Sequence, residues 1–172
     1  MVGGIVMAME NLMRSAADFG ESDRVRRNTA EEVNRMLDTR MEDRVRGYAA
    51  GGGEAEISSR IEELEREWSI ERLIETEASM MGLTGLGLGA FVNRKFLALP
   101  ALVGSMVLLH GVQGWYPMLP LFRRLGFRSR EEIDREKFAM KVLRGDFDRV
   151  EADGTADERD RVMRALAAVR KS

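Results

Sequence analysis

The side chains that could do chemistry in this 172-residue chain are few. Cysteine is absent, so thiolate metal sites, iron–sulfur clusters, disulfides and cysteine nucleophiles are excluded. The one histidine, His110, leaves little scope for histidine-based metal binding or for a nucleophile–histidine triad. We therefore predict that the chain has no catalytic, cofactor-binding or metal-ligating residues and that it is not an enzyme.

Two polar residues, His110 and Gln113, are nevertheless candidates for function because they lie in a long apolar stretch. An imidazole within a membrane could relay protons, whereas haem ligation would need a dimer to supply a second histidine. The structural alternative is a hydrogen bond between helices or to water at the membrane surface. We favour the structural role and keep both residues as possible functional polar groups.

Charge divides the chain into three parts, although the net charge is only −2. Residues 1–77 carry a net charge of −7 and residues 123–172 carry +3, while residues 78–122 contain only Arg94 and Lys95 as charged side chains. The near-zero total gives no global attraction to phosphate backbones, so we predict no nucleic-acid partner.

The apolar middle, residues 78–122, predicts a two-span transmembrane helical hairpin. About 20 helical residues match a hydrocarbon core of about 30 Å, and Phe96–Trp115 fits that length before Pro117 and Pro120. The first span is weaker, because from Ile74 it includes Glu75 and Glu77. Only Asn93, Arg94 and Lys95 separate the spans, which forces the helices to be antiparallel. The alternative is a buried hairpin at the centre of a soluble helical bundle.

Small residues recur on one face of each predicted span, where they would let two helices approach closely. They would pack either within the hairpin or between two copies in a homodimer, and the GxxxG pattern fits both. These helix-packing candidates are Ser79, Gly82, Gly85, Gly89, Ala101, Gly104, Ser105 and Gly111.

The arms on either side of the hairpin are predicted to be amphipathic, cytoplasmic helices, which makes the fold all-α. Capping-box patterns place helix starts at Thr29, Ser59, Ser129 and Thr155, and glycines end helices at Gly51–Gly53 and at Gly145. The expected division is an N-terminal helical arm (1–56), an amphipathic helix leading into the membrane (57–77), the hairpin (78–122) and a C-terminal helical arm (123–172).

Aromatic and basic residues beside the spans predict where the membrane surface lies, since both types favour the headgroup region. The arginines also place both termini on the cytoplasmic side, against the weaker opposing signal of Arg94 and Lys95. Glu75 or Glu77 could pair with Arg123 or Arg124 if the hairpin closes. The predicted interface residues are Trp68, Trp115, Tyr116, Arg123, Arg124 and Arg128.

The central segment resembles the YgaP-like transmembrane domain family, a short bacterial inner-membrane module of unknown function. The resemblance covers residues 69 to about 134 and implies an inner-membrane hairpin without implying an activity. Tyr116 stands where the family has a cysteine before proline, and the rhodanese domain to which some members are fused is not found here. The matching motifs are Glu71-Arg72, Gly82 to Gly89, Asn93 to Lys95, Gly114 to Pro117 and Leu125 to Ser129.

These observations predict a small bacterial inner-membrane protein that serves as an anchor or scaffold. Its partners would be the lipid bilayer, a second or further copy of the chain, and a cytoplasmic protein held by the arms. The alternative is a subunit of a small oligomeric transporter or channel. Polar replacements of Leu37, Met41 and Leu64 should release a scaffold's partner, whereas His110→Ala should impair a transporter.

Overall fold

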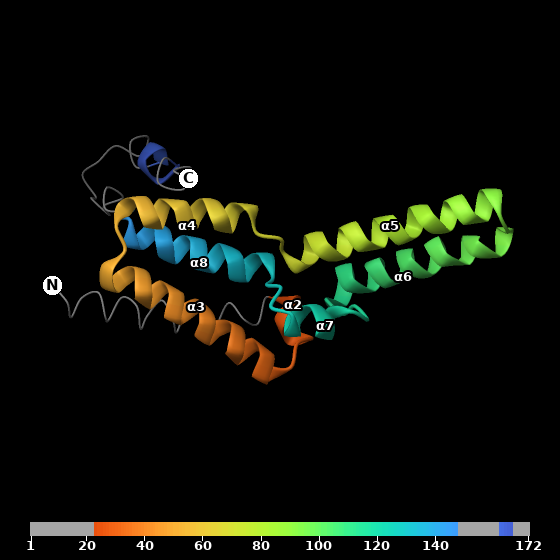
Figure 1. Ribbon diagram of the computed structural model, residues 1–172, viewed down its shortest axis with the longest axis horizontal. Coiled ribbons are helices and arrows are strands. Elements are labelled where there is room, and N and C mark those ends of the chain that lie inside the picture. The colour runs from red at the N-terminus through yellow and green to blue at the C-terminus, as the bar shows by residue number, and fades with distance from the viewer. Residues whose placement is uncertain (1–22, 148–161, 167–172) are drawn as a thin grey trace. The chain divides into compact units, whose positions relative to one another are not determined.

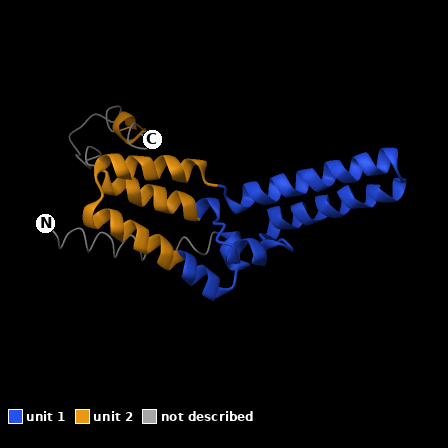
Figure 2. Ribbon diagram, in the orientation of Figure 1, with its two compact units in different colours: residues 1–37, 68–131 blue, residues 38–67, 132–172 orange. Residues whose placement is uncertain are grey.

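The computed structural model describes residues 23–147 and 162–166, and every regular element in these residues is a helix, which confirms the all-α prediction. The chain divides into two compact units, unit 1 from residues 1–37 and 68–131 and unit 2 from residues 38–67 and 132–172 (Figure 2). In chain order the helices are α2 (Arg24–Arg27), α3 (Glu31–Gly51), α4 (Glu54–Arg66), α5 (Ile70–Phe91), the 3-10 helix η1 (Arg94–Leu97), α6 (Ala98–Gln113), α7 (Leu119–Arg124) and α8 (Arg130–Leu143).

Unit 2 is built from α4 and most of α3 and α8 (Figures 1 and 2). The apolar residues of α4 recur every three or four positions, so Ile57, Ile61 and Leu64 lie on one side of the helix and are buried. They form a core with Ile133 and Met140 of α8. Val45, Tyr48 and Leu143 pack around this core.

A buried carboxylate crosslinks the three helices of unit 2. Glu136 of α8 is fully buried, and its oxygens accept hydrogen bonds from Arg44 of α3 and Arg60 of α4 at 2.8 to 3.1 Å. Charge-assisted bonds of this kind are stronger than neutral ones, and two arginines neutralise one buried charge. Each helix of the bundle is therefore tied to the same side chain.

Unit 1 contains an antiparallel hairpin of α5 and α6, joined by Val92, Asn93 and η1 (Figure 1). Asn93 begins η1, and its side chain accepts a hydrogen bond from the Lys95 amide at 2.9 Å. α6 ends at Gln113, and Gly114 follows with a φ of 76° that favours glycine. The predicted tight turn and the predicted end of the second apolar helix agree with these bounds.

The core of unit 1 lies at the open end of the hairpin, away from the turn. Ile70 and Ile74 of α5 meet Val25 of α2, Tyr116 and Leu119 there. Met106, Phe122 and Phe127 pack against the same cluster. The hairpin is thus held at one end by the segment that follows α6 and by α2, which is far from the hairpin in sequence.

The predicted continuous helix over residues 57–77 is instead two helices. α4 ends at Arg66, and Ser69 begins α5 by accepting a hydrogen bond from the Arg72 amide at 3.4 Å. The Ile70 amide donates to the Arg128 carbonyl at 2.9 Å. Because this amide is satisfied across the fold, the break costs no backbone hydrogen bond at Ile70.

Two of the predicted capping boxes are also wrong. The Thr29 hydroxyl donates to the Val25 carbonyl at 2.8 Å and accepts from Arg123 at 3.1 Å, and α3 begins only at Glu31. Ser59 lies inside α4, which starts five residues earlier, after Gly53. Serine and threonine bind backbone or side-chain groups in many settings, so the local pattern did not fix their partners.

The other predicted helix ends agree better with the structure. α3 ends at Gly51, and α8 begins directly after Ser129. α8 ends at Leu143, and Gly145 follows with a φ of 78°. Of the predicted C-terminal helix, residues 162–166 are helical, whereas Thr155, Glu158 and Val169 lie outside the described residues.

Candidate functional site at the open end of the hairpin

The apolar surface of the hairpin is exposed. Residues 94–113 are the one described helical segment long and apolar enough to cross a membrane, and only 6% of its apolar window is buried. α5 does not qualify by the same measure, because its first turns carry Glu71, Arg72, Glu75 and Glu77. Eleven large apolar side chains are exposed along the hairpin: Met80, Met81, Leu83, Leu86, Phe91, Val92, Phe96, Leu97, Leu102, Leu108 and Val112.

Two glycines set the close approach of α5 to the start of α6. A Cβ atom on Gly85 would lie 2.6 Å from Cδ of Pro100, and one on Gly89 would lie 2.5 Å from a methyl carbon of Leu97. Both distances are shorter than real Cβ contacts allow. These two residues therefore pack within the hairpin.

The remaining small residues of the predicted packing set do not meet across the hairpin. A Cβ on Gly82, Gly104 or Gly111 would have nothing within 4 Å, and Ala101 is exposed. The hydroxyls of Ser79 and Ser105 donate to backbone carbonyls of their own helices, those of Glu75 at 2.6 Å and Ala101 at 2.9 Å. The structure brings together only the pair nearest the turn.

At the open end of the hairpin, Tyr116 joins the two helices. Its hydroxyl donates to a carboxylate oxygen of Glu77 at 2.7 Å, and its side chain is buried. Burial and the hydrogen bond to Glu77 raise the pKa of Tyr116 to about 12. The expected pairing of Glu77 with Arg123 or Arg124 is wrong, because Glu77 binds this tyrosine.

His110 lies beside Tyr116, with the ring centroids 6.1 Å apart and the rings nearly perpendicular. Nδ1 of His110 is buried and has no hydrogen-bond partner in the structure. The residue lines a cavity of about 290 Å³ together with Asp23, Arg24, Glu71 and Glu75. Val25, Gly111, Gly114 and Glu131 complete the lining.

This cavity mixes charges of both signs, and several of its polar groups are already occupied. The Asp23 side chain accepts from the Val25 amide at 2.9 Å and from the Ser129 hydroxyl, and Glu71 accepts from the Arg130 amide at 3.1 Å. Within the described ranges, no three His, Asp or Glu side chains are placed to hold a metal ion. The arrangement is that of a polar seam between helices.

α2 covers the end of α6, a contact that was not predicted from the sequence. The Asn28 amide donates to the Gln113 carbonyl at 2.7 Å, and the Arg24 guanidinium donates to the Gly111 carbonyl. A Cβ on Gly114 would lie 2.5 Å from the Arg24 carbonyl oxygen, so glycine is required there. The last carbonyls of α6 therefore find donors, and Gln113 contributes through its backbone. No local pattern marks Arg24 and Asn28 for this role.

The predicted interface residues separate into buried and exposed groups. Tyr116, Arg123 and Arg128 are 3%, 0% and 5% exposed, so protein surrounds their side chains, and their place at the membrane surface stays a prediction. Arg123 donates to Thr29, to the Asn34 side chain at 2.8 Å and to the Phe127 carbonyl at 3.2 Å. It ties the helices of unit 1 together.

The exposed members of the interface set are Trp68, Trp115 and Arg124. The guanidinium of Arg72 lies 4.5 Å from the centre of the Trp68 ring, which is a cation–π contact. Trp115 lies two residues beyond the end of α6, and Arg124 ends α7. These residues remain available to lipid.

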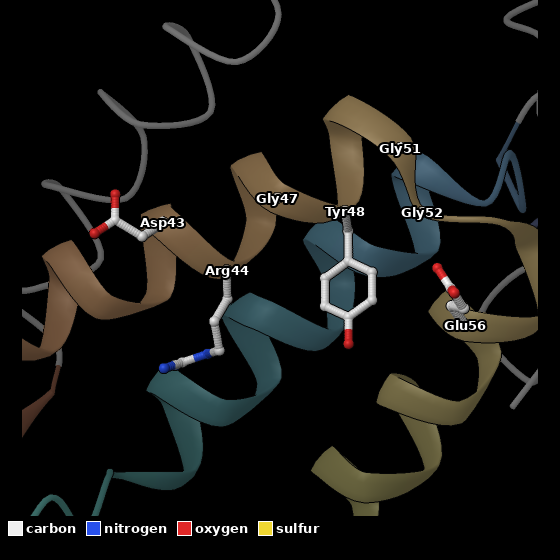
Figure 3. Close-up of a pocket in the computed structure, with 7 residues that line it drawn as sticks. All are labelled: Asp43, Arg44, Gly47, Tyr48, Gly51, Gly52 and Glu56. Atoms are coloured by element: carbon white, nitrogen blue, oxygen red, sulfur yellow. The ribbon is translucent and has the colours of Figure 1, made fainter.

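Unit 2 has a recess of about 470 Å³ beside the glycines that end α3 (Figure 3). Arg44 and Tyr48 point to one side of α3 and Asp43 points to the other (Figure 3). Arg44 is engaged by Glu136, and Glu56 accepts a hydrogen bond from the Gly53 amide at 3.3 Å. No polar groups converge in this recess to do chemistry.

No family model, no curated protein and no solved structure matches the chain. The resemblance to the YgaP-like module therefore stays a prediction from the motifs.

Proposed function

We propose that the chain is a small integral membrane protein in which the α5–α6 hairpin crosses the bilayer and anchors helical arms. The observation that carries the proposal is the exposure of the apolar helical segment 94–113, since only 6% of its apolar window is buried. The core helix of a soluble bundle would be covered by its own protein, and this one is not covered by the described residues.

The exposed side chains of the hairpin are more stable in hydrocarbon than in water. Withdrawing one large apolar side chain from water contributes roughly 1.5–3 kcal/mol, and the hairpin exposes eleven of them. A surface of this size is larger than soluble monomers ordinarily expose. Hydrocarbon removes the cost of exposing these side chains to water. A hydroxyl in the hairpin is compatible with hydrocarbon where it binds its own backbone, as the Thr84 hydroxyl does when it donates to the Met80 carbonyl at 2.8 Å.

The charges at the two ends of the hairpin support an orientation. The turn carries Arg94 and Lys95, whereas the segments 68–77 and 114–131 carry five arginines. Orientation is set while the chain inserts, before Arg123 and Arg128 can be buried, so all five count. The larger number supports an orientation with the arms on the cytoplasmic side of a bacterial inner membrane.

The function that this design supports best is anchoring or scaffolding. Unit 2 is a compact helical bundle with its own core, and α8 exposes Phe138 and Val142 one helical turn apart. The predicted test at Leu37, Met41 and Leu64 needs correction, because Leu37 and Leu64 are buried core residues whose replacement would unfold the arm. Phe138→Ser with Val142→Ser tests partner binding without opening the core.

Carbonate extraction of the expressed full chain tests the membrane proposal directly. We expect the protein to stay with the membrane fraction, to need detergent for release and to have a protein mass in the detergent complex that distinguishes one copy from several. Release by carbonate as a soluble particle would overturn the proposal and return residues 78–122 to the core of a soluble assembly.

A second candidate, a subunit of an oligomeric transporter, has one observation in its favour. Nδ1 of His110 lacks a partner near the cavity at the open end of the hairpin, and an imidazole can carry a proton. Proton flux into vesicles containing the purified chain, followed with a pH-sensitive dye, tests this function. A proton flux that the wild-type chain supports and His110→Ala does not would favour transport over anchoring. The same flux in vesicles with the chain and in empty vesicles would exclude the transport function.

A further inference from the structure

The exposed apolar surface does not stop where α6 ends. Leu108 and Val112 of α6 are 68% and 65% exposed, and beyond Gly114 the exposed large apolar side chains continue at a spacing of three or four residues. We name these residues the apolar collar: Trp115, Met118, Leu121 and Leu125.

The other side of the same segment is buried in unit 1. Tyr116, Leu119 and Arg123 are between 0% and 3% exposed, and Tyr116 and Leu119 belong to the core cluster. α7 therefore packs firmly, and the exposed residues of the collar alternate with these buried residues along the segment. Four large apolar side chains facing water within eleven residues would be costly for a soluble protein.

Arg124 is the one exposed polar side chain between residues 115 and 125. Its neighbour Arg123 is fully buried, so two adjacent arginines have opposite environments. An arginine beside exposed tryptophan, methionine and leucine matches the membrane boundary, where rings and aliphatic groups meet acyl chains and a guanidinium meets phosphate.

We propose that the apolar collar and Arg124 lie in the headgroup layer of the leaflet on the side of the arms, where Arg124 binds the phosphate of anionic lipid. The occupant is lipid because the collar continues the exposed surface of α6 and because its single exposed charge is positive. The inference rests on the proposed membrane function, and it adds a lipid class and a depth for a named segment.

Tryptophan quenching in reconstituted vesicles tests the depth. Trp68→Phe leaves Trp115 as the chain's only tryptophan, and Trp115→Phe leaves Trp68 as a control. Both are exposed, so neither change opens the core. Tyr116 binds Glu77 next to Trp115, and Ile70 at the start of α5 is about 10 Å of helix rise from Glu77. We therefore expect Trp68 to lie farther from the acyl chains than Trp115.

The vesicles contain phosphatidylcholine with bromine either near the glycerol end or near the end of the acyl chains. We expect Trp115 to be quenched about twofold more by shallow bromine than by deep bromine, and Trp68 to be quenched weakly by both. If neither bromine position quenches Trp115 in a protein that resists carbonate extraction, the proposed depth of the collar is wrong and the membrane proposal still stands. Release by carbonate would instead defeat the membrane proposal itself.

Lipid selectivity tests Arg124. The association of spin-labelled phosphatidylglycerol, relative to phosphatidylcholine, should fall up to about fivefold in Arg124→Gln. Arg35→Gln, an exposed arginine on α3, is the matched control and should leave the ratio unchanged. Equal ratios in wild type and Arg124→Gln would overturn the phosphate contact. A dimer in which Trp115 is shielded from bromine would show that a second copy covers the collar.

Discussion

The hairpin and the helical bundle of unit 2 use similar apolar residues in opposite ways. In unit 2, Ile61, Leu64 and Met140 are at most 2% exposed. In α6, Leu102 and Leu108 are 54% and 68% exposed, and Val103 is the residue that is buried against its neighbours. The comparison teaches that a helix's apolar content does not say whether protein or lipid will cover it.

Polar groups differ between the two regions in the same way. Unit 2 buries the charge of Glu136 and neutralises it with two arginines from other helices. In the hairpin, the hydroxyls of Ser79, Thr84 and Ser105 each bind a carbonyl of their own helix. Unit 2 is thus held together by specific long-range bonds, whereas the hairpin relies on close packing near its turn, at Gly85 and Gly89.

The largest expected effect removes the central bond of unit 2. Glu136→Leu leaves Arg44 and Arg60 without their shared carboxylate, and because Arg60 is mostly buried we expect a loss of about 3 kcal/mol in the free energy of unfolding. Denaturant unfolding followed by circular dichroism measures it. Asp134→Asn, which breaks only the surface pair with Lys137, should cost less than about 0.5 kcal/mol. Equal losses in both variants would contradict the crosslinking role.

A charge on the exposed side of α6 should separate lipid from water as the hairpin's solvent. Leu102→Arg places a guanidinium near the middle of the apolar segment and should reduce membrane insertion by about 2.5 kcal/mol, seen as a fall in the carbonate-resistant fraction. Phe138→Arg on α8 is the control and should not change that fraction. If Leu102→Arg inserts as well as wild type, the hairpin does not face hydrocarbon.

Close packing inside the hairpin predicts a difference between two glycines on the same helix. Gly85→Ala forces a Cβ into the rigid ring of Pro100 and should destabilise the hairpin by about 2 kcal/mol, measured as thermal unfolding in detergent. Gly82→Ala meets open space and should be neutral or slightly stabilising. The reverse order would mean that Gly82 packs against another copy.

The smallest expected effect concerns the bond that joins the two helices at their open end. Tyr116→Phe removes the hydrogen bond to Glu77 and should cost about 1 kcal/mol of unfolding free energy at neutral pH. Denaturant unfolding of the variant and of the wild-type protein in detergent measures this loss. An unchanged stability would show that Glu77 finds another donor.

The pH dependence of that bond has a definite sign. The pKa of Tyr116 is about 12 in the folded protein against an ordinary 10.0, so its contribution is complete below pH 10 and is lost as the pH rises through 12. In a Tyr48→Phe background, Tyr116 is the only tyrosine, and its ionisation can be followed by absorbance. Titration of Tyr116 at its ordinary value would contradict its burial.

Much of the fold was predictable because it depends on local signals. The apolar run, the turn at Asn93 and the glycines at Gly51 and Gly145 fixed helix ends by conformational preference alone. The break at Ser69 was missed, because it depends on the Ile70 amide finding the Arg128 carbonyl far along the chain. Thr29 was misread for the same reason, since Arg123 competes for its hydroxyl.

The sequence by itself determined an all-helical chain with an apolar hairpin, because helical periodicity, charge spacing and turn residues act over a few positions. Only the tertiary structure decided that Arg123 is buried while Arg124 is exposed, and that Tyr116 binds Glu77. The physical reason is that burial and pairing depend on contacts between distant segments. Arg123 and Arg124 are the same residue type at adjacent positions, so the sequence alone could not show which of them would be buried.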